Sequence, residues 1–433
     1  MGYWPDESRF ETSRTIARWL LAGDRTSAFK ELGTPDHFLF KMIGVLPAGL
    51  QLLIAPSSSI PSLFFSLSSA INLLLLWSIV KRLGESDRVA FFATIMFALS
   101  TTNLYYSRHL LPYDTAMTFA LLSLRNGTKS PSSAIHSIGC GFFSLLAFLT
   151  YNGYWPIAGF AILTHVICPP REIRRLLARG FLSSLTFLLG FFLISSALPI
   201  KGGHFFQGLL GFSRTVTQGV FSEGWSLPFA YLWFAEHTLL FLWAIALGFA
   251  IVSSRWHQPN RARTIAIAGV VVIYGSLVLT SVFLSKFVVY GRLAKPLVPF
   301  FCLLTALFLE WLFLRSSYAR RLAKGIIGLT CLQAAMNFYE PLSQVFPKDF
   351  HQQAAARILR DSRRIDPSRY RMLFVSHIYP VPLTVFQPSG TVLMQARHPL
   401  QYAPYQFEGY TPSDRHRLRT LDFSMRLVLS DKP

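Results

Sequence analysis

The amino-acid sequence predicts an all-α polytopic membrane protein of about ten spanning helices, followed by a small mixed α/β external domain. Of its 433 residues, 52% are hydrophobic and only 14% are charged, whereas a soluble domain carries about 25% charged residues. The stretches 60–80 and 264–285 contain no charged residue, and each is long enough to cross a hydrocarbon core of about 30 Å as a helix. Because lipid offers no partner for backbone polar groups, such stretches must be helical.

Two segments precede the first of these stretches and are expected to lie outside the membrane, within residues 1–59. The first, roughly Ser8–Leu21, has the pattern of an amphipathic helix that ends at Gly23-Asp24. The pattern places Phe10, Ala17, Leu20 and Leu21 on one side, with Arg14 and Arg18 elsewhere.

The second segment, 37–54, is apolar but contains Lys41, Pro47 and Gly49. Counting it as a span would move the acidic N-terminal residues to the cytoplasmic side, if the later loops keep their sides. We therefore interpret it as an interfacial or re-entrant helix on the outer face.

The apolar stretches that follow are the expected spanning helices of a transmembrane domain, residues 60–340. They lie near 60–80, 89–105, 110–124, 134–150, 154–168, 180–199, 229–253, 264–284, 293–314 and 325–340.

Residues 341–433 differ in composition from the spans, because they are rich in Arg, His, Pro and Tyr. Two short runs, Arg371–Val375 and Thr391–Met394, have the residue types of β-strands. We expect a small mixed domain here, on the same side of the membrane as the N-terminus.

The distribution of basic residues predicts which side each loop faces. Formal net charge is +20, from 41 Lys and Arg against 21 Asp and Glu, which in a soluble protein would suggest a nucleic-acid partner. Here most loop Lys and Arg fall in alternate loops, as the positive-inside rule requires of cytoplasmic loops. The basic loops are 81–88, 125–133, 169–179, 254–263 and 315–324. They indicate a membrane protein with no nucleic-acid partner.

The cysteines and lone histidines do not predict a metal site or a disulfide framework. Cys140, Cys168, Cys302 and Cys331 lie in or beside apolar runs without a Cys-x-x-Cys pair, which favours structural packing. No metal-ligand spacing joins the histidines at 136, 165 and 377.

The motif Pro5-Asp6-Glu7-Ser8-Arg9-Phe10 stands out in a chain that is poor in acids. Proline and carboxylates favour the first turn of any helix, so a purely structural role is one interpretation. The expected position of the motif, outside the membrane and before an amphipathic helix, favours a functional one.

Several motifs in order resemble those of the GT-C membrane glycosyltransferases, such as protein O-mannosyltransferases and lipid A aminoarabinose transferases. They are Pro5–Phe10 with the helix that ends at Leu20–Asp24, Tyr105–Asp114 and Val289–Pro299. In that family a His-Pro-Pro-Leu or Lys-Pro-Pro-Leu segment follows, whereas Pro35–Lys41 lacks the Pro-Pro pair. Family members also begin with a spanning helix before the acidic loop. This sequence begins within the loop, so the resemblance implies that a first helix lies upstream or is absent.

The resemblance implies transfer of a sugar from a polyprenyl-phosphate donor to a lipid, glycan or protein acceptor, with inversion. The reaction would occur outside a bacterial cytoplasmic (inner) membrane. Its acceptor must lose a proton to a nearby carboxylate. By position in the motif, Asp6 would be the general base and Glu7 its helper, with Asp114 as a second acidic candidate whose other interpretation is a helix N-terminal acid. No cofactor is expected, although some family members use a divalent metal.

The lipid phosphate that leaves would need cations at the outer membrane boundary. The candidates are Arg108, Arg292, Lys286, Lys295 and Lys41, of which Arg292 and Arg108 are favoured. The alternative for each is snorkelling towards lipid headgroups.

Glu236 and His237 fall inside an expected span, where an ionisable residue suggests a function. They could line a cavity or form a structural pair. The long loop 201–227 could close over the donor or be only a connection. Two other classes remain possible: a transporter or lipid flippase, and a non-catalytic membrane protein.

Overall fold

The computed structural model describes twelve ranges of the chain, and the account below concerns these alone. They are 8–32, 37–54, 59–107, 110–129, 133–167, 173–197, 227–253, 260–284, 291–340, 370–376, 392–395 and 425–431.

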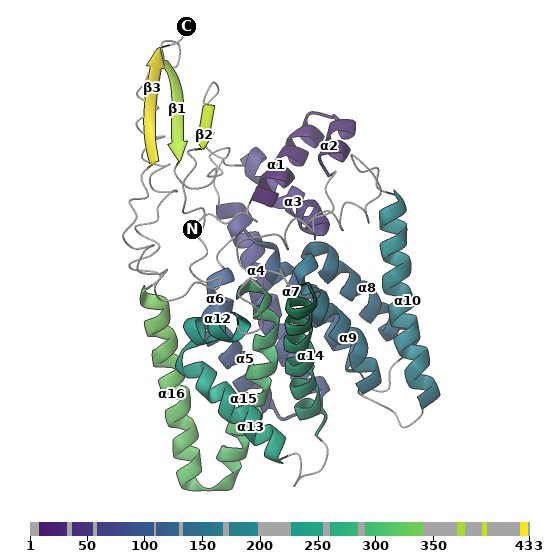
Figure 1. Cartoon of the computed structure of the whole chain (residues 1–433), viewed down its shortest axis with the longest axis vertical. Helices are drawn as coiled ribbons and strands as arrows, with labels where there is room; N and C mark the ends of the chain where they lie inside the picture. Colours follow the sequence, from purple (N-terminus) through teal and green to yellow (C-terminus); the bar gives the residue numbers. More distant parts are fainter. Residues whose placement is uncertain are drawn as a thin grey trace.

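The described N-terminal part forms three helices at one end of the molecule (Figure 1), namely α1 (Ser8–Leu21), α2 (Arg25–Glu31) and α3 (Phe38–Ile54). The Asp24 carboxylate caps α2 by accepting a 2.9 Å hydrogen bond from the Ser27 backbone N–H. The Ser27 hydroxyl also donates to this carboxylate, and that bond, followed by the backbone bond, holds the pKa of Asp24 below its usual value. The bounds of α1 match the predicted amphipathic segment.

The face of α1 that is buried differs from the predicted one. Phe10 and Ala17 are buried as expected, but Leu20 and Leu21 are 45% and 52% exposed. Arg14, expected on the other side, is only 3% exposed. The reason is that α1 packs along α3, where the Ser13 hydroxyl donates a 2.9 Å hydrogen bond to the Lys41 carbonyl.

The remaining described helices form a bundle, in which each predicted span contains helix. They are α4 (Ser59–Arg82), α5 (Asp87–Leu99), α6 (Thr101–Tyr106), α7 (Pro112–Gly127), α8 (Ala134–Thr150), α9 (Trp155–Ile167), α10 (Ile173–Ala197), α12 (Leu227–Glu236), α13 (Thr238–Ser253), α14 (Arg261–Leu284), α15 (Val298–Arg315) and α16 (Ser317–Glu340), with short 3-10 turns η2 (Asn152–Tyr154), η4 (Gly291–Leu293) and η5 (Lys295–Leu297).

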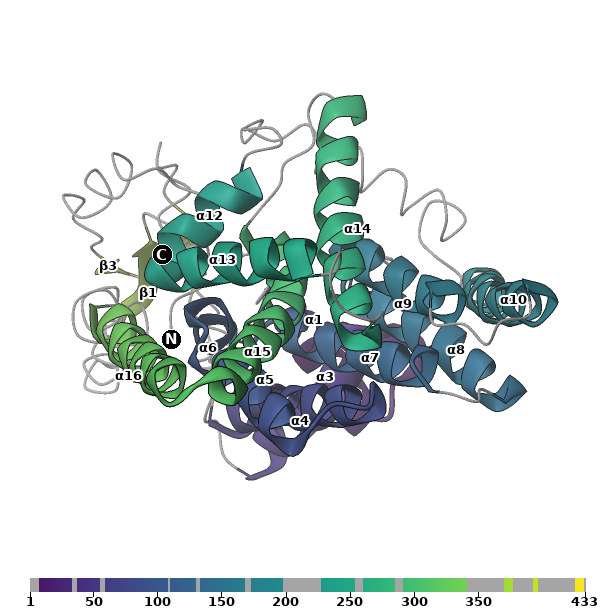
Figure 2. The same cartoon turned by 90° about the horizontal axis from the view of Figure 1, so that it is seen from below.

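Among the described residues, four stretches are long and apolar enough to cross a membrane by length and composition: Ile60–Arg82, Leu177–Ser196, Arg261–Thr280 and Lys295–Arg315. The last is the most buried of the four, because α15 packs against α5, α13, α14 and α16. Seen from below, α10 and α16 lie at opposite edges of the bundle, with α5, α7 and α15 between them (Figure 2).

Two predicted spans are interrupted rather than continuous. Within 89–105, the backbone of Ser100 is extended and separates α5 from α6. Within 229–253, His237 has a left-handed φ of 46° and separates α12 from α13. Hydropathy follows side chains and carries no information on such backbone breaks.

Small residues allow α8 and α10 to pack closely. Ser137 and Gly141 are one turn apart on α8, a spacing typical of close helix pairs in membranes. The Ser183 hydroxyl of α10 donates a 2.9 Å hydrogen bond to the Ser137 carbonyl. A β-carbon at Gly141 would overlap the Ser183 carbonyl oxygen.

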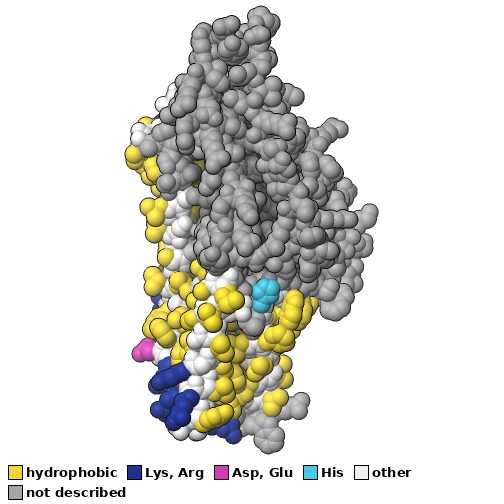
Figure 3. Space-filling view, turned by 90° about the vertical axis from the view of Figure 1, so that its left-hand side faces the viewer, with side chains coloured by type: hydrophobic (Ala, Val, Ile, Leu, Met, Phe, Trp, Pro, Cys, Tyr) yellow, Lys and Arg dark blue, Asp and Glu magenta, His cyan; other side chains and the backbone are white. Residues whose placement is uncertain are grey.

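Basic side chains gather at the end of the bundle away from α1–α3. On the face that carries α16, Figure 3 shows Lys and Arg at the lower end and hydrophobic side chains above them. Arg82 donates a 2.8 Å hydrogen bond to the Arg125 carbonyl there, which joins two predicted basic loops. Arg320, Arg321 and Lys324 lie at the start of α16 and are exposed.

Three described strands form a mixed sheet in the C-terminal part: β1 (Tyr370–Ser376), β2 (Val392–Gln395) and β3 (Met425–Asp431). Their order is β2-β1-β3. β1 pairs in parallel with β2, with Leu373 opposite Val392, and antiparallel with β3, with Phe374 opposite Leu427. The first two strands overlap the two predicted β-runs.

Candidate active site

A buried ion pair joins the beginnings of α7 and α15. Pro112 starts α7 with its fixed φ, and Asp114 follows in the first turn, where a carboxylate suits the free N–H groups. The Lys295 ammonium lies 2.5 Å from Oδ1 of Asp114, and neither side chain is more than 6% exposed. Asn72 of α4 donates a 3.1 Å hydrogen bond to the Asp114 carbonyl. Asp114 is therefore engaged inside the bundle and is not a surface helix acid.

Arg292 lies next to this pair and is also buried. Its Nη1 donates a 2.7 Å hydrogen bond to the Tyr113 hydroxyl. Its guanidinium carbon is 5.6 Å from the centroid of the Tyr113 ring and 6.0 Å from that of Tyr151. These contacts fix the orientation of the guanidinium, so Arg292 is held within the bundle and does not snorkel.

Aromatic rings extend the site towards the N-terminal helices. The Tyr113 ring packs edge-on against Tyr106, at 5.1 Å between centroids, and against Tyr151, at 4.9 Å. Tyr151 in turn stacks on His37, with centroids 5.2 Å apart. The Lys295 ammonium is 5.3 Å from the Tyr106 ring centroid. The site is thus a set of cations enclosed by tyrosines.

Lys41 belongs to the same end of the bundle. It lies one turn after His37 on α3, where its backbone N–H donates to the His37 carbonyl at 3.0 Å. Its side chain is fully buried, which excludes the alternative of a headgroup-facing lysine.

Positive charge exceeds negative charge among the buried side chains that the structure describes. Arg14, Lys41, Arg292 and Lys295 are buried, against the carboxylates of Asp114 and Glu236. Arg292 and Lys295 come from the same short segment before α15, so two of these cations lie close together in the bundle.

Glu236, the last residue of α12, binds the start of α6 through its carboxylate. Its carboxylate accepts hydrogen bonds from the Ser100 hydroxyl at 2.7 Å and from the backbone N–H groups of Thr101, at 3.0 Å, and Thr102, at 2.8 Å. It therefore binds the first turn of α6 and links the two helix interruptions. This arrangement fits the structural interpretation of Glu236. His237, at the adjacent break, is partly exposed.

The described residues bring together Asp114, Arg292 and Lys295 from the predicted set, with Lys41 on the neighbouring helix. Asp6, Glu7, Arg108 and Lys286 lie outside the described residues, as does the predicted lid 201–227 except for its last residue. Within the described part of the chain, no group of three or more His, Cys, Asp or Glu side chains could hold a metal ion.

The tyrosines, His37 and Asn72 were not among the predicted site residues. Tyr106 and Tyr113 belong to the motif Tyr105–Asp114, but aromatic residues in apolar segments are usually core. The repeated tyrosines around a lone Arg-His pair and Asp114 were the available signal.

The helical arrangement of the described residues has counterparts among solved structures. Two solved structures of ArnT from Cupriavidus metallidurans share it. The one bound to undecaprenyl phosphate matches with a TM-score of 0.53 and 16% identity over 78% of this chain and 61% of that chain. The apo structure matches with a TM-score of 0.55 and 16% identity over 83% and 65%.

This chain therefore spans less than two thirds of the length of either ArnT structure. No family model matches the sequence. No curated protein matches it either.

Proposed function

We propose that this protein transfers a sugar from a polyprenyl-phosphate donor to an acceptor on the non-cytoplasmic side of a bacterial inner membrane, with inversion. The observation that carries the proposal is the buried Arg292 and Lys295, next to Asp114, at one end of a GT-C helical bundle. One of the ArnT structures that share this fold is bound to undecaprenyl phosphate.

The cations suit the group that leaves in such a reaction. When the bond between the sugar C1 and the phosphate oxygen breaks, the electron pair stays on the phosphate, whose charge increases. Cations that are already oriented in a water-poor site stabilise that charge most effectively. Arg292 is oriented by Tyr113, and Lys295 by Asp114. Lys41 is buried on the adjoining helix. From the sequence we assign Arg108 and Lys286 to the same role.

The acceptor has to lose its proton as it attacks C1. We assign this step to Asp6, with Glu7 as its helper, from their position in the N-terminal motif. Asp114 is already paired with Lys295, so its first role in this scheme is to hold that ammonium in place. Its second carboxylate oxygen leaves it a candidate for contact with the acceptor.

The sidedness rests on the basic loops. Arg320, Arg321 and Lys324 of the predicted cytoplasmic loop 315–324 lie at the start of α16, at the end of the bundle opposite α1–α3 (Figures 1 and 3). Under the positive-inside rule, the Asp114 end then faces the non-cytoplasmic side.

Binding of undecaprenyl phosphate tests the phosphate site without knowledge of the sugar. The full chain in detergent would be titrated with undecaprenyl phosphate and with undecaprenol, which has the same chain and no phosphate. We expect only the phosphate to bind. Arg292→Gln should weaken it by about tenfold or more, since a hydrogen bond to a charged group contributes about 1.5–3 kcal/mol. Arg321→Gln, at the other end of the bundle, should leave binding unchanged. Equal binding of the two lipids would contradict the proposal.

Reconstituted vesicles supplied with polyprenyl-phosphate sugars test the transfer itself. Release of polyprenyl phosphate that depends on an acceptor and is lost in Asp6→Ala supports the enzyme. Passage of intact donor across the membrane without release would instead identify a flippase.

A further inference from the structure

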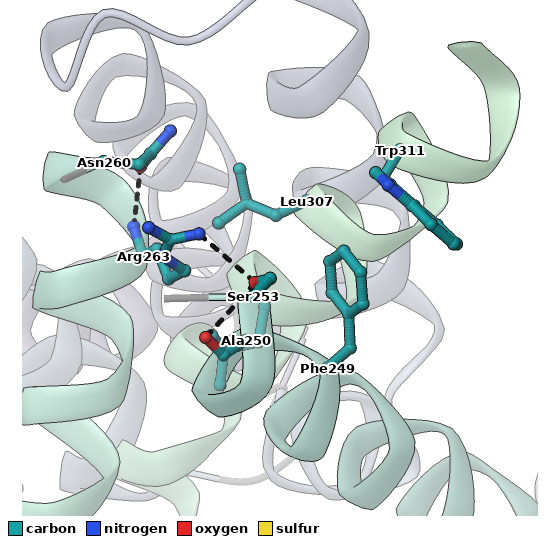
Figure 4. Close-up of a pocket in the computed structure, with 8 residues that line it drawn as sticks. Phe249, Ala250, Ser253, Asn260, Arg263, Leu307 and Trp311 are labelled. Carbon is teal, nitrogen blue, oxygen red and sulfur yellow. Dashed lines mark hydrogen bonds between the residues drawn. The ribbon is translucent and has the colours of Figure 1, made fainter. Parts of the chain in front are cut away.

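A cavity lies between α13, α14 and α15, away from the Asp114 site and towards the end of the bundle opposite α1–α3 (Figures 1 and 4). Its volume is about 450 Å³. Trp311 at one wall lies more than three helical turns beyond the start of α15, and Lys295 precedes that helix, so the two residues are on the order of 20 Å apart. The lining residues are Phe249, Ala250, Ser253, Asn260, Arg263, Leu304, Leu307 and Trp311.

One side of the cavity is polar and built around Arg263. Its Nη1 donates a 3.2 Å hydrogen bond to the Ser253 hydroxyl. Its backbone N–H donates a 2.9 Å hydrogen bond to Oδ1 of Asn260. Asn260 in turn donates from Nδ2 to the Glu85 carboxylate at 2.8 Å. The end of α13 and the start of α14 thus hold a cation at the cavity in a defined position.

The other side is apolar and aromatic. The rings of Phe249 and Trp311 pack with centroids 4.8 Å apart, and Leu304 and Leu307 complete the wall. A second cation flanks this wall, because the Arg315 guanidinium carbon lies 4.6 Å from the centroid of the Trp311 ring. Arg263 therefore lines the polar side of the cavity, opposite a hydrocarbon wall, and Arg315 stacks on the Trp311 ring of that wall.

The surroundings of the cavity are those of a lipid-facing surface. Ile251 and Val252 on α13 and Leu314 on α15 are large apolar residues that are 47%, 59% and 69% exposed. In a spanning bundle such side chains face acyl chains. A ligand that enters from this side comes from the membrane.

We propose that this cavity binds an anionic membrane phospholipid, with its phosphate at Arg263 and one acyl chain along Phe249, Leu307 and Trp311. The occupant follows from charge and shape together: a basic pocket between spanning helices on the cytoplasmic side suits an anionic headgroup, and the apolar wall suits its chain. The site is separate from that of the sugar donor and would join α13 to α14 and α15.

Native mass spectrometry of the full chain in detergent tests this proposal. The delipidated protein would be titrated with phosphatidylglycerol and with phosphatidylcholine of the same acyl chains. We expect one phosphatidylglycerol to bind in preference. Arg263→Gln should weaken it by about tenfold, the loss of one charge-assisted contact, and Arg263→Lys by less. Arg321→Gln, exposed at the same end of the bundle, is the matched control and should leave binding unchanged.

A second pair of variants tests the acyl-chain wall without touching the cation. Leu307→Trp fills the cavity and should abolish the preferred phosphatidylglycerol. Leu314→Trp adds the same bulk on the exposed side of α15 and should not. Equal binding of the two lipids, or unchanged phosphatidylglycerol binding in both Arg263→Gln and Leu307→Trp, would overturn the proposal. Displacement of phosphatidylglycerol by an equal concentration of undecaprenyl phosphate in Arg292→Gln, which leaves the cavity intact, would also overturn it, because the cavity would then be a polyprenyl-lipid site.

Discussion

The ammonium nitrogen of Lys295 lies 2.5 Å from the carboxylate of Asp114, although 181 residues separate them in the sequence. This contact fastens η5, just before α15, to the first turn of α7. It has a consequence for stability and another for function, and variants separate the two.

Removing one partner of the pair should destabilise the protein strongly. Lys295→Met leaves the Asp114 carboxylate buried without its cation, which costs about 3–5 kcal/mol in comparable pairs. The double variant Asp114→Leu/Lys295→Met replaces both charges with apolar groups and should recover most of the loss. Thermal unfolding in detergent measures both. Undecaprenyl-phosphate binding should stay weak in the double variant. Restored binding there would remove Lys295 from the phosphate site.

The hydroxyl of Tyr113 should contribute to undecaprenyl-phosphate binding because it orients Arg292. Tyr113→Phe keeps the ring but removes the acceptor of the 2.7 Å hydrogen bond from Arg292. We expect undecaprenyl-phosphate binding to fall by about three- to tenfold, less than in Arg292→Gln, because the cation stays but loses its orientation. Tyr318→Phe, on an exposed residue of α16, is the control. If the two phenylalanine variants bind alike, Tyr113 does not orient Arg292.

Glu236 should stabilise the start of α6. Glu236→Ala leaves the Ser100 hydroxyl and two backbone N–H groups without their acceptor, and each buried donor left unsatisfied costs about 1–3 kcal/mol. Glu236→Gln keeps one oxygen acceptor, so its stability should lie between those of wild type and Glu236→Ala. Ser100→Ala removes one bond to Glu236 and the N-cap bond from the Asn103 N–H, so its loss of stability should lie below that of Glu236→Ala without being zero. Thermal unfolding in detergent measures these differences. A thermal-unfolding midpoint of Glu236→Ala equal to that of wild type would show that these bonds do not stabilise the fold.

The close packing of α8 and α10 should not tolerate a methyl group at Gly141. Gly141→Ala places its β-carbon on the Ser183 carbonyl oxygen, so the helices must separate. We expect a loss of about 1–3 kcal/mol, the usual range for overpacking. Gly159→Ala on α9 is the matched control, because a β-carbon added at Gly159 would meet no neighbouring atom within 4 Å. Similar unfolding temperatures for both variants would mean that α8 and α10 adjust freely.

The sequence predicted where most helices lie, but it did not predict which faces they pack together or where the backbone breaks. The bounds of α1 and the positions of β1 and β2 follow from local patterns that survive in the structure. Arg14 shows the limit, since an amphipathic projection of α1 alone does not reveal which side α3 covers. The breaks at Ser100 and His237 were missed because they are backbone features within apolar runs.

The charged residues of the candidate site were among those predicted from the sequence, but the tyrosines that surround them were not. Asp114, Arg292 and Lys295 stand out because ionisable residues are rare in this chain, and a family resemblance orders them. The contact between Arg292 and Tyr113 joins residues 179 positions apart, and no local pattern encodes it. The tyrosines resemble ordinary core residues until that neighbour is known.

The three hydrogen bonds to Glu236 have a mechanical consequence. They tie the last residue of α12 to the first turn of α6, while Tyr106 at the other end of α6 touches the Lys295 ammonium. The helices α6 and α12 are therefore joined end to end by these bonds. A shift of α12 would then move α6 and, at the far end of α6, the Tyr106 ring beside the Lys295 ammonium.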